Sequence, residues 1–168
     1  MEFAYRCGLF LIAALLSTSV LPRIMPWGYY PDLFLILICS FALLRGRKKG
    51  LFWGVLGALI QDLYSLGTNI LIKPVLGILA GYLEGKIYKS NFFMAPFIIL
   101  LFSMLNGTLS FLVQEDFLFQ IPFGQALMNV IVPGALIDCV MSFLLYPILY
   151  SVERRWFSLR EETYMEVR

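Results

Sequence analysis

The chain has 168 residues, of which 60% are hydrophobic and 14% charged, and its formal net charge is +2. A disordered chain is excluded, because it would be poor in apolar residues and rich in charge. Six membrane-spanning helices of about 20 residues each would use about 120 residues. Little length is left for a soluble catalytic or nucleic-acid-binding domain. We therefore expect one all-α integral membrane domain that does not bind nucleic acid.

Six apolar segments follow one another along the sequence, separated by short polar joints. We expect membrane spans at approximately residues 7–21, 31–44, 50–66, 70–85, 92–113 and 125–150, and a cytoplasmic tail at residues 151–168. The start of the chain, a cation before an apolar run, also fits a signal peptide. No A-x-A-like cleavage site follows it, which favours a first membrane span.

The second span opens with Pro31 and Asp32. Proline is well suited to the first turn of a helix, where its missing N–H is not needed. An aspartate beside it is favoured by the helix dipole. Asp32 therefore has two open interpretations, a helix-terminal anion or a buried polar contact. Lys73, near the start of the fourth span, could pair with Asp32 or with Asp62.

A dense basic segment follows the second span and is expected to be a loop. It contains Arg45, Arg47, Lys48 and Lys49. Such cations are typical of a topology signal that is attracted to anionic lipid, at about 1 kcal/mol for each cation near the surface. The alternative is a docking site for a cytoplasmic protein. We favour the topology signal.

The third and fourth spans form the expected centre of the fold, a helical hairpin. Small residues recur four apart in each helix, so they share one face and leave a groove for another backbone. These helix-packing positions are Gly50, Gly54 and Ala58 in the first helix and Gly77, Gly81 and Gly85 in the second. Asp62 stands one further step of four along the first groove. A carboxylate at membrane depth is expected to face protein or water.

Two more polar residues interrupt the later spans. Asn106 lies in the fifth span and is expected to form an interhelical hydrogen bond. Asp138 lies near the middle of the sixth span, where a charge is most costly. Pro133 in the same span should kink the helix and free backbone carbonyls that neighbours must satisfy.

The distribution of Lys and Arg predicts the orientation of the chain. With both ends in the cytoplasm, eleven cations lie inside and two, Arg23 and Lys73, lie outside, which is a strong positive-inside bias. The inside set is Arg6, Arg45, Arg47, Lys48, Lys49, Lys86, Lys89, Arg154, Arg155, Arg160 and Arg168. An even number of spans, with N-in and C-in topology, follows from this pattern.

Catalytic motifs are absent from the sequence. The chain contains no histidine, the commonest general base and metal ligand. It has no nucleophile elbow, HExxH motif, Walker phosphate loop or GxGxxG motif. Asp62 and Asp138 could form an aspartic dyad, but no conserved-looking polar motif surrounds either residue. We expect no catalytic, cofactor-binding or metal-binding site.

Several short motifs carry a resemblance to a known family. They are Pro31-Asp32-Leu33, Arg45-Gly46, Gly54, Gly57, Gln61-Asp62-Leu63, Ser65 and the stretch from Gly77 to Gly81-Tyr82. In these motifs, in length and in its six-span layout, the whole chain resembles the MreD family of bacterial rod shape-determining proteins.

The resemblance implies a non-enzymatic scaffold in the bacterial plasma membrane, in contact with membrane lipids. Its implied partner is MreC, a single-span protein with an extracytoplasmic domain, and its implied role is to support rod shape and sidewall peptidoglycan synthesis. Further implied partners are a glycan polymerase, a penicillin-binding transpeptidase and, indirectly, filaments of the actin-like MreB.

The fold of the family is similar to that of the substrate-binding subunits of energy-coupling factor transporters. A vitamin-binding subunit of such a transporter is therefore the alternative function. It would need a pocket of outward-facing polar groups. Residues that could supply this pocket are Asp32, Asp62, Asn69, Lys73, Asn106 and Asn129.

Overall fold

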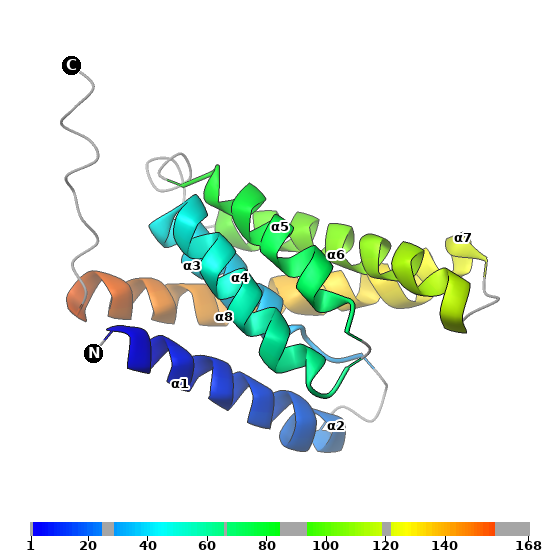
Figure 1. Cartoon of the computed structure of the whole chain (residues 1–168), viewed down its shortest axis with the longest axis horizontal. Coiled ribbons are helices and arrows are strands. Elements are labelled where there is room, and N and C mark those ends of the chain that lie inside the picture. Colours follow the sequence, from blue (N-terminus) through cyan, green and yellow to red (C-terminus); the bar gives the residue numbers. More distant parts are fainter. Residues whose placement is uncertain (1, 25–28, 66, 85–93, 119–121, 157–168) are drawn as a thin grey trace.

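The computed structural model describes residues 2–24, 29–65, 67–84, 94–118 and 122–156. Within these ranges the chain forms six continuous helical segments, in the order of the six predicted spans (Figure 1). The first combines α1 (Glu2–Leu15), the π-helical η1 (Leu16–Val20) and α2 (Leu21–Ile24). The next four are α3 (Leu33–Arg45), α4 (Arg47–Asp62), α5 (Asn69–Gly81) and α6 (Met94–Leu118). The last combines α7 (Phe123–Ala126), the π-helical η2 (Leu127–Ile131) and α8 (Val132–Trp156).

The helical segments fall into two length classes. Three are long and apolar enough to cross a membrane, at Phe3–Ile24, Met94–Val113 and Phe123–Arg154. The shortest, α3 and α5, have 13 residues each. A helix of that length extends over about 20 Å, against about 30 Å for the hydrocarbon core of a bilayer. The prediction of six helices is confirmed in the described part of the chain, and a length sufficient for spanning is shown for three.

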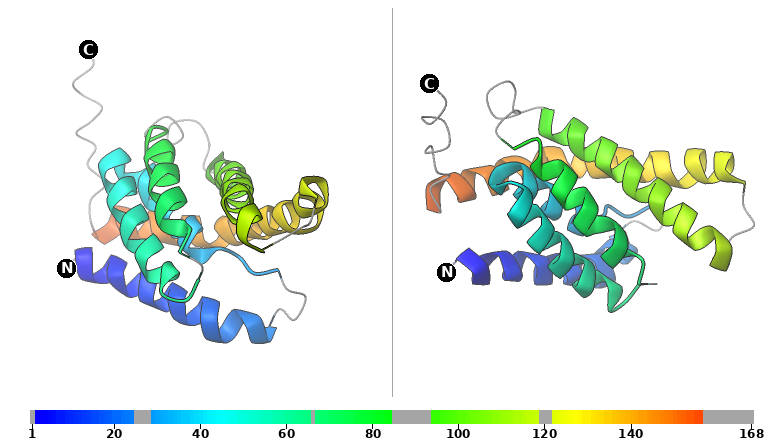
Figure 2. Two further views of the ribbon diagram at one scale, coloured as in Figure 1. Left: turned by 45° about the vertical axis from the view of Figure 1, so that its right-hand side comes forward. Right: turned by 45° about the horizontal axis from the view of Figure 1, so that its top comes forward.

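The central helix of the bundle is α3, which corrects the prediction that the hairpin of the third and fourth spans forms the centre of the fold. Every residue from Leu33 to Leu44 is buried, and α3 packs against α1, α4, α5, α6 and α8. Figures 1 and 2 show the three short helices lying between α1 on one side and α6 on the other. The sequence of α3 is apolar on all sides, as expected for a helix enclosed by other helices. Asp32 caps α3 by accepting a hydrogen bond from Leu35 N at 3.0 Å.

The α4–α5 hairpin is packed backbone to backbone. A Cβ atom added to Gly50 would overlap the carbonyl oxygen of Gly77, and one added to Gly77 would overlap that of Gly50. A Cβ atom on Gly54 would lie 2.7 Å from Cα of Pro74. Side chains at these positions would therefore force the two helices apart.

The ends of the same two stripes are also enclosed. A Cβ atom on Gly81 would lie 2.6 Å from Cα of Arg47, at the start of α4. Ala58 is fully buried. Gly85, the last of the predicted helix-packing positions, lies outside the described residues.

The basic segment is helical, which corrects the prediction of a loop at residues 45–49. Gly46, with φ of +79°, is the single residue between α3 and α4. Arg47, Lys48 and Lys49 form the first turn of α4, where the helix dipole disfavours cations. Helix stability therefore does not explain their position. The guanidinium of Arg47 lies 4.5 Å from the centroid of the Tyr82 ring, and all three side chains are exposed.

The last segment departs from a regular α-helix immediately before Pro133. The N–H of Val132 donates to the carbonyl of Leu127, five residues back, which closes the π-helical turn η2. Proline cannot donate the next backbone hydrogen bond, so the helix changes its bonding pattern at this point. The predicted disturbance at Pro133 thus takes the form of a π-turn.

Candidate functional site: a polar cavity between α6 and α8

A buried ion-pair cluster joins three helices at one end of the bundle. Oε1 of Glu153, on α8, lies 2.9 Å from Nε of Arg6 on α1, and its Oε2 lies 2.7 Å from Nη2 of Arg45 on α3. The side chains of Glu153 and Arg6 are 0% and 3% exposed. The Arg6 guanidinium also lies over the rings of Phe41 and Trp53, at 5.6 and 5.9 Å from their centroids. The cluster therefore fastens α1 and α8 to the central helix.

Glu153 was missed in the sequence because the tail was expected to begin at residue 151. The structure continues α8 to Trp156, and residues 157–168 lie outside the described part of the chain. The spacing of residues in the last span could have indicated that Glu153 is buried. The buried residues of α8 recur three or four apart, as residues on one helix face do. They are Asp138, Ser142, Tyr146, Leu149 and Glu153. Arg45, predicted as a topology signal, is also an internal ion-pair partner.

A second ion pair lies at the start of α3, the end opposite to Arg45. Nζ of Lys73, on α5, lies 2.6 Å from Oδ2 and 2.8 Å from Oδ1 of Asp32, and it also donates to Oε1 of Gln61. The side chain of Lys73 is fully buried. Of the two predicted partners of Lys73, the structure places Asp32 next to it.

Asp62 instead caps the start of α5. Its Oδ2 accepts a hydrogen bond from Ile70 N at 2.9 Å, and its Oδ1 accepts from Asn69 Nδ2 at 2.7 Å and Ser65 Oγ at 3.0 Å. Its side chain is partly exposed at the hairpin joint. A carboxylate is favoured there because helix N-termini carry unpaired N–H groups and a partial positive charge. Asp62 and Asp138 belong to different polar clusters, so the structure does not assemble them as a dyad.

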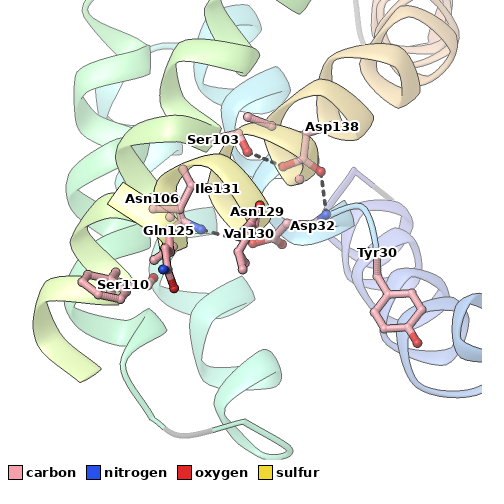
Figure 3. A pocket seen from close by; sticks show the side chains of 15 residues that line it. Tyr30, Asp32, Ser103, Asn106, Ser110, Gln125, Asn129, Val130, Ile131 and Asp138 are labelled. Atoms are coloured by element: carbon pink, nitrogen blue, oxygen red, sulfur yellow. Dashed lines mark hydrogen bonds between the residues drawn. The ribbon is translucent and has the colours of Figure 1, made fainter. Parts of the chain in front are cut away.

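Asp138 is bound from two directions. Its Oδ1 accepts a hydrogen bond from Asp32 N at 2.7 Å, and its Oδ2 accepts from Ser103 Oγ on α6 at 2.5 Å (Figure 3). Asn106, one turn along α6, places Nδ2 at 3.5 Å from Oδ2 of Asp32. The Oδ1 atom of Asn106 is buried and has no hydrogen-bond partner among the residues that the structure describes.

These polar groups line a cavity of about 520 Å³ between α6, the segment from α7 to α8, and the residues before α3 (Figure 3). Three of the predicted site residues, Asp32, Asn106 and Asp138, meet there, and Asn129 of η2 also lines it. Sequence analysis missed Ser103 and Ser110, although together with Asn106 they recur three and four apart and share one face of α6. Among the lining residues that the structure describes, two are acidic and none is Lys or Arg.

A comparison with models of known protein families finds a match. A family model described as rod shape-determining protein MreD matches residues 2–155. No curated protein and no solved structure matches the chain. The matched range includes both ion pairs, the cavity and the six helical segments except Trp156, the last residue of α8.

Proposed function

The chain belongs to the MreD family of rod shape-determining proteins, and on this premise we propose that it is a non-enzymatic membrane scaffold of the bacterial cell-elongation machinery. The observation that carries the proposal is the family match over residues 2–155, which covers the bundle rather than a part of it. Membership implies a role in rod shape determination. The scaffold would hold MreC in the plasma membrane and so support sidewall peptidoglycan synthesis.

The outer surface of the bundle supports a membrane setting. Leu11 in α1, Leu101 in α6 and Leu144 in α8 are 58%, 59% and 62% exposed, on helices long enough to span a bilayer. Apolar side chains that are exposed along such helices are expected to face lipid. We propose a multi-pass protein of the plasma membrane.

The positions of the cations support the N-in, C-in orientation. Arg6 and Arg45 meet at Glu153, so the start of α1 and the end of α8 share one end of the bundle. Lys73 is the fifth residue of α5 and pairs with Asp32 at the start of α3, the end opposite to Arg45. We place the Arg6 end in the cytoplasm by the positive-inside rule. Lys86, Lys89, Arg160 and Arg168 lie outside the described residues.

The helices that could contact MreC can be reduced to two. The candidate spans for a lipid-facing groove that receives MreC are the second, third and sixth, which correspond to α3, α4 and α8. Of these, α3 is buried from Leu33 to Leu44 and offers no face to a partner. The outer faces of α4 and α8 remain, where Leu59 is 51% and Leu144 is 62% exposed. We propose that the single helix of MreC packs on one of these two faces.

The function is tested by isolating the tagged chain from native membranes in mild detergent and identifying its partners by mass spectrometry. We expect a single-span protein with an extracytoplasmic domain, together with a glycan polymerase and a penicillin-binding transpeptidase. A paired ATPase and a coupling membrane subunit would instead establish the transporter alternative. Recovery of neither set would overturn the scaffold.

The surface is tested by placing a photo-crosslinking amino acid at Leu59 or at Leu144, with Leu11 of α1 as the matched lipid-facing control. We expect a crosslink to MreC from one of the first two positions and none from Leu11. Equal crosslinking from all three positions would contradict a defined partner face. Asp138→Leu is less suitable, because Asp138 is 3% exposed and its loss would disturb the bundle itself.

A further inference from the structure

The cavity between α6 and α8 has no part in the proposed scaffold role, and we propose that it binds an amphiphile. The head of this ligand would carry hydrogen-bond donors, as a hydroxyl or an ammonium group, and its apolar body would lie along the helices. The site would exist whether or not the chain binds MreC.

The size and lining of the cavity suit a small ligand. Its volume of about 520 Å³ lies within the range of roughly 300–1,000 Å³ that is typical of small-molecule sites. Phe111 of α6 and Val130 and Ile131 of η2 give it apolar walls, against which an alkyl body could pack. Such sites combine mostly apolar walls with a few converging polar groups.

The converging polar groups are mostly acceptors. The buried Oδ1 of Asn106 has no partner in the described part of the chain, and a buried acceptor without a donor costs free energy. Each carboxylate oxygen of Asp138 accepts one hydrogen bond from the protein and can accept a second. A ligand hydroxyl or ammonium would supply the donors that these atoms lack.

The charge of the cavity selects against anionic heads. Asp32 and Asp138 line it, and none of its described lining residues is Lys or Arg. Lys73, which lies behind Asp32 and pairs with it, neutralises one of the two carboxylates at most. An anionic ligand would meet like charge in a partly desolvated site, whereas a neutral or cationic head would not.

The wall of the cavity contains the π-helical turn η2, with Asn129, Val130 and Ile131 among the lining residues. A π-helical turn inside an α-helical segment is rare and recurs at functional sites. The irregular part of the last helical segment therefore lines the cavity.

Gly134 allows the cavity to be filled without strain. It lines the cavity, and a Cβ atom added to it would meet no atom within 4 Å. Gly134→Leu should therefore occupy the ligand volume and leave the helices in place. Gly8→Leu is the matched control, because Gly8 on α1 has the same open surroundings and is not among the lining residues.

The test uses photoreactive diazirine probes that share one alkyl chain and carry an amine, a hydroxyl or a carboxylate. The full chain is reconstituted in phosphatidylcholine nanodiscs, and the labelled residues are mapped by mass spectrometry. We expect the amine and hydroxyl probes to label cavity residues about tenfold more than the carboxylate probe. Gly134→Leu should lower this labelling about tenfold, and Gly8→Leu should leave it unchanged.

Equal labelling by the three probes, or labelling that persists in a folded Gly134→Leu variant, would overturn the proposal. If Gly134→Leu fails to fold, Val130→Phe replaces it, since Val130 is 60% exposed at the same cavity. Extraction of the protein purified from native membranes distinguishes the sources of the ligand. A retained lipid with a hydroxyl or amine head would support the site, and so would a retained free amphiphile. Loss of the retained molecule in Gly134→Leu would show that it binds in the cavity.

Discussion

The two halves of the bundle use the space between their helices in opposite ways. In the α4–α5 hairpin, Gly50 and Gly77 bring backbone against backbone and leave no room for a methyl group. Between α6 and α8, polar side chains surround a cavity of about 520 Å³, and Gly134 faces open space. A glycine in an apolar helix therefore marks close packing only where an opposing helix approaches it. The sequence alone does not distinguish the two situations.

Removal of Glu153 should have the largest effect, because this residue ties α8, which belongs to the open half, to α1 and α3. Glu153→Ala removes the carboxylate that pairs with the buried Arg6, and breaking a buried ion pair typically costs about 3–5 kcal/mol. We expect a loss of that size in the free energy of unfolding, measured by denaturant titration in detergent.

Arg154→Ala is the control for this prediction, because Arg154 is the exposed neighbour of Glu153 and should change stability by less than about 0.5 kcal/mol. Equal stability of Glu153→Ala and wild type would show that the cluster does not fasten α8 to α1 and α3.

Addition of a methyl group to one glycine in each half should affect the stability of the protein differently. Gly77→Ala would drive Cβ into the Gly50 carbonyl, and overpacking of this kind costs about 1–3 kcal/mol. Gly134→Ala meets no atom within 4 Å and should be neutral or stabilise by up to about 1 kcal/mol, since alanine favours a helix over glycine. Thermal melts of the two variants side by side measure the difference. Similar shifts in both variants would refute the contrast between a closed and an open half.

Substitution of Asp62 at the joint between α4 and α5 should have the smallest effect on stability. Asp62→Ala removes the carboxylate that accepts hydrogen bonds at the start of α5, and loss of such a cap costs about 0.5–2 kcal/mol. Asp62→Asn keeps a side-chain oxygen and should lose less. Hydrogen exchange of the amide of Ile70 is the local readout, and unchanged protection in Asp62→Ala would exclude the capping role.

The six helices could be predicted because their signal is local. Runs of apolar residues are separated by polar residues, proline and glycine, and each run gave one helical segment. The ends were less predictable. Residues 45–49 look like a loop by charge, yet α4 begins at Arg47, because Gly46 alone makes the turn between two helices.

The partners of the polar residues could not be predicted, because they depend on how helices far apart in the sequence pack. The sequence allowed Lys73 to pair with either Asp32 or Asp62. The packing of α3 against α5 brings Asp32 next to it. Asp138 was identified as costly, but its donors, Ser103 and the backbone of Asp32, follow from the tertiary fold. Glu153 lay beyond the last predicted span, although it continues the buried face of α8.

The π-turn at η2 sets the rotational phase of the last segment. A π-turn accommodates one extra residue, and each residue of an α-helix advances the side chains by about 100°. Deletion of one residue from Leu127–Ile131 would restore a regular helix and rotate everything before it relative to Asp138 and Glu153. Gln125 would then turn away from α6, while the buried stripe of α8 stayed in place. Gln125, before η2, therefore faces the cavity, and Glu153 of α8 faces Arg6 and Arg45. The π-turn allows both directions within one helical segment.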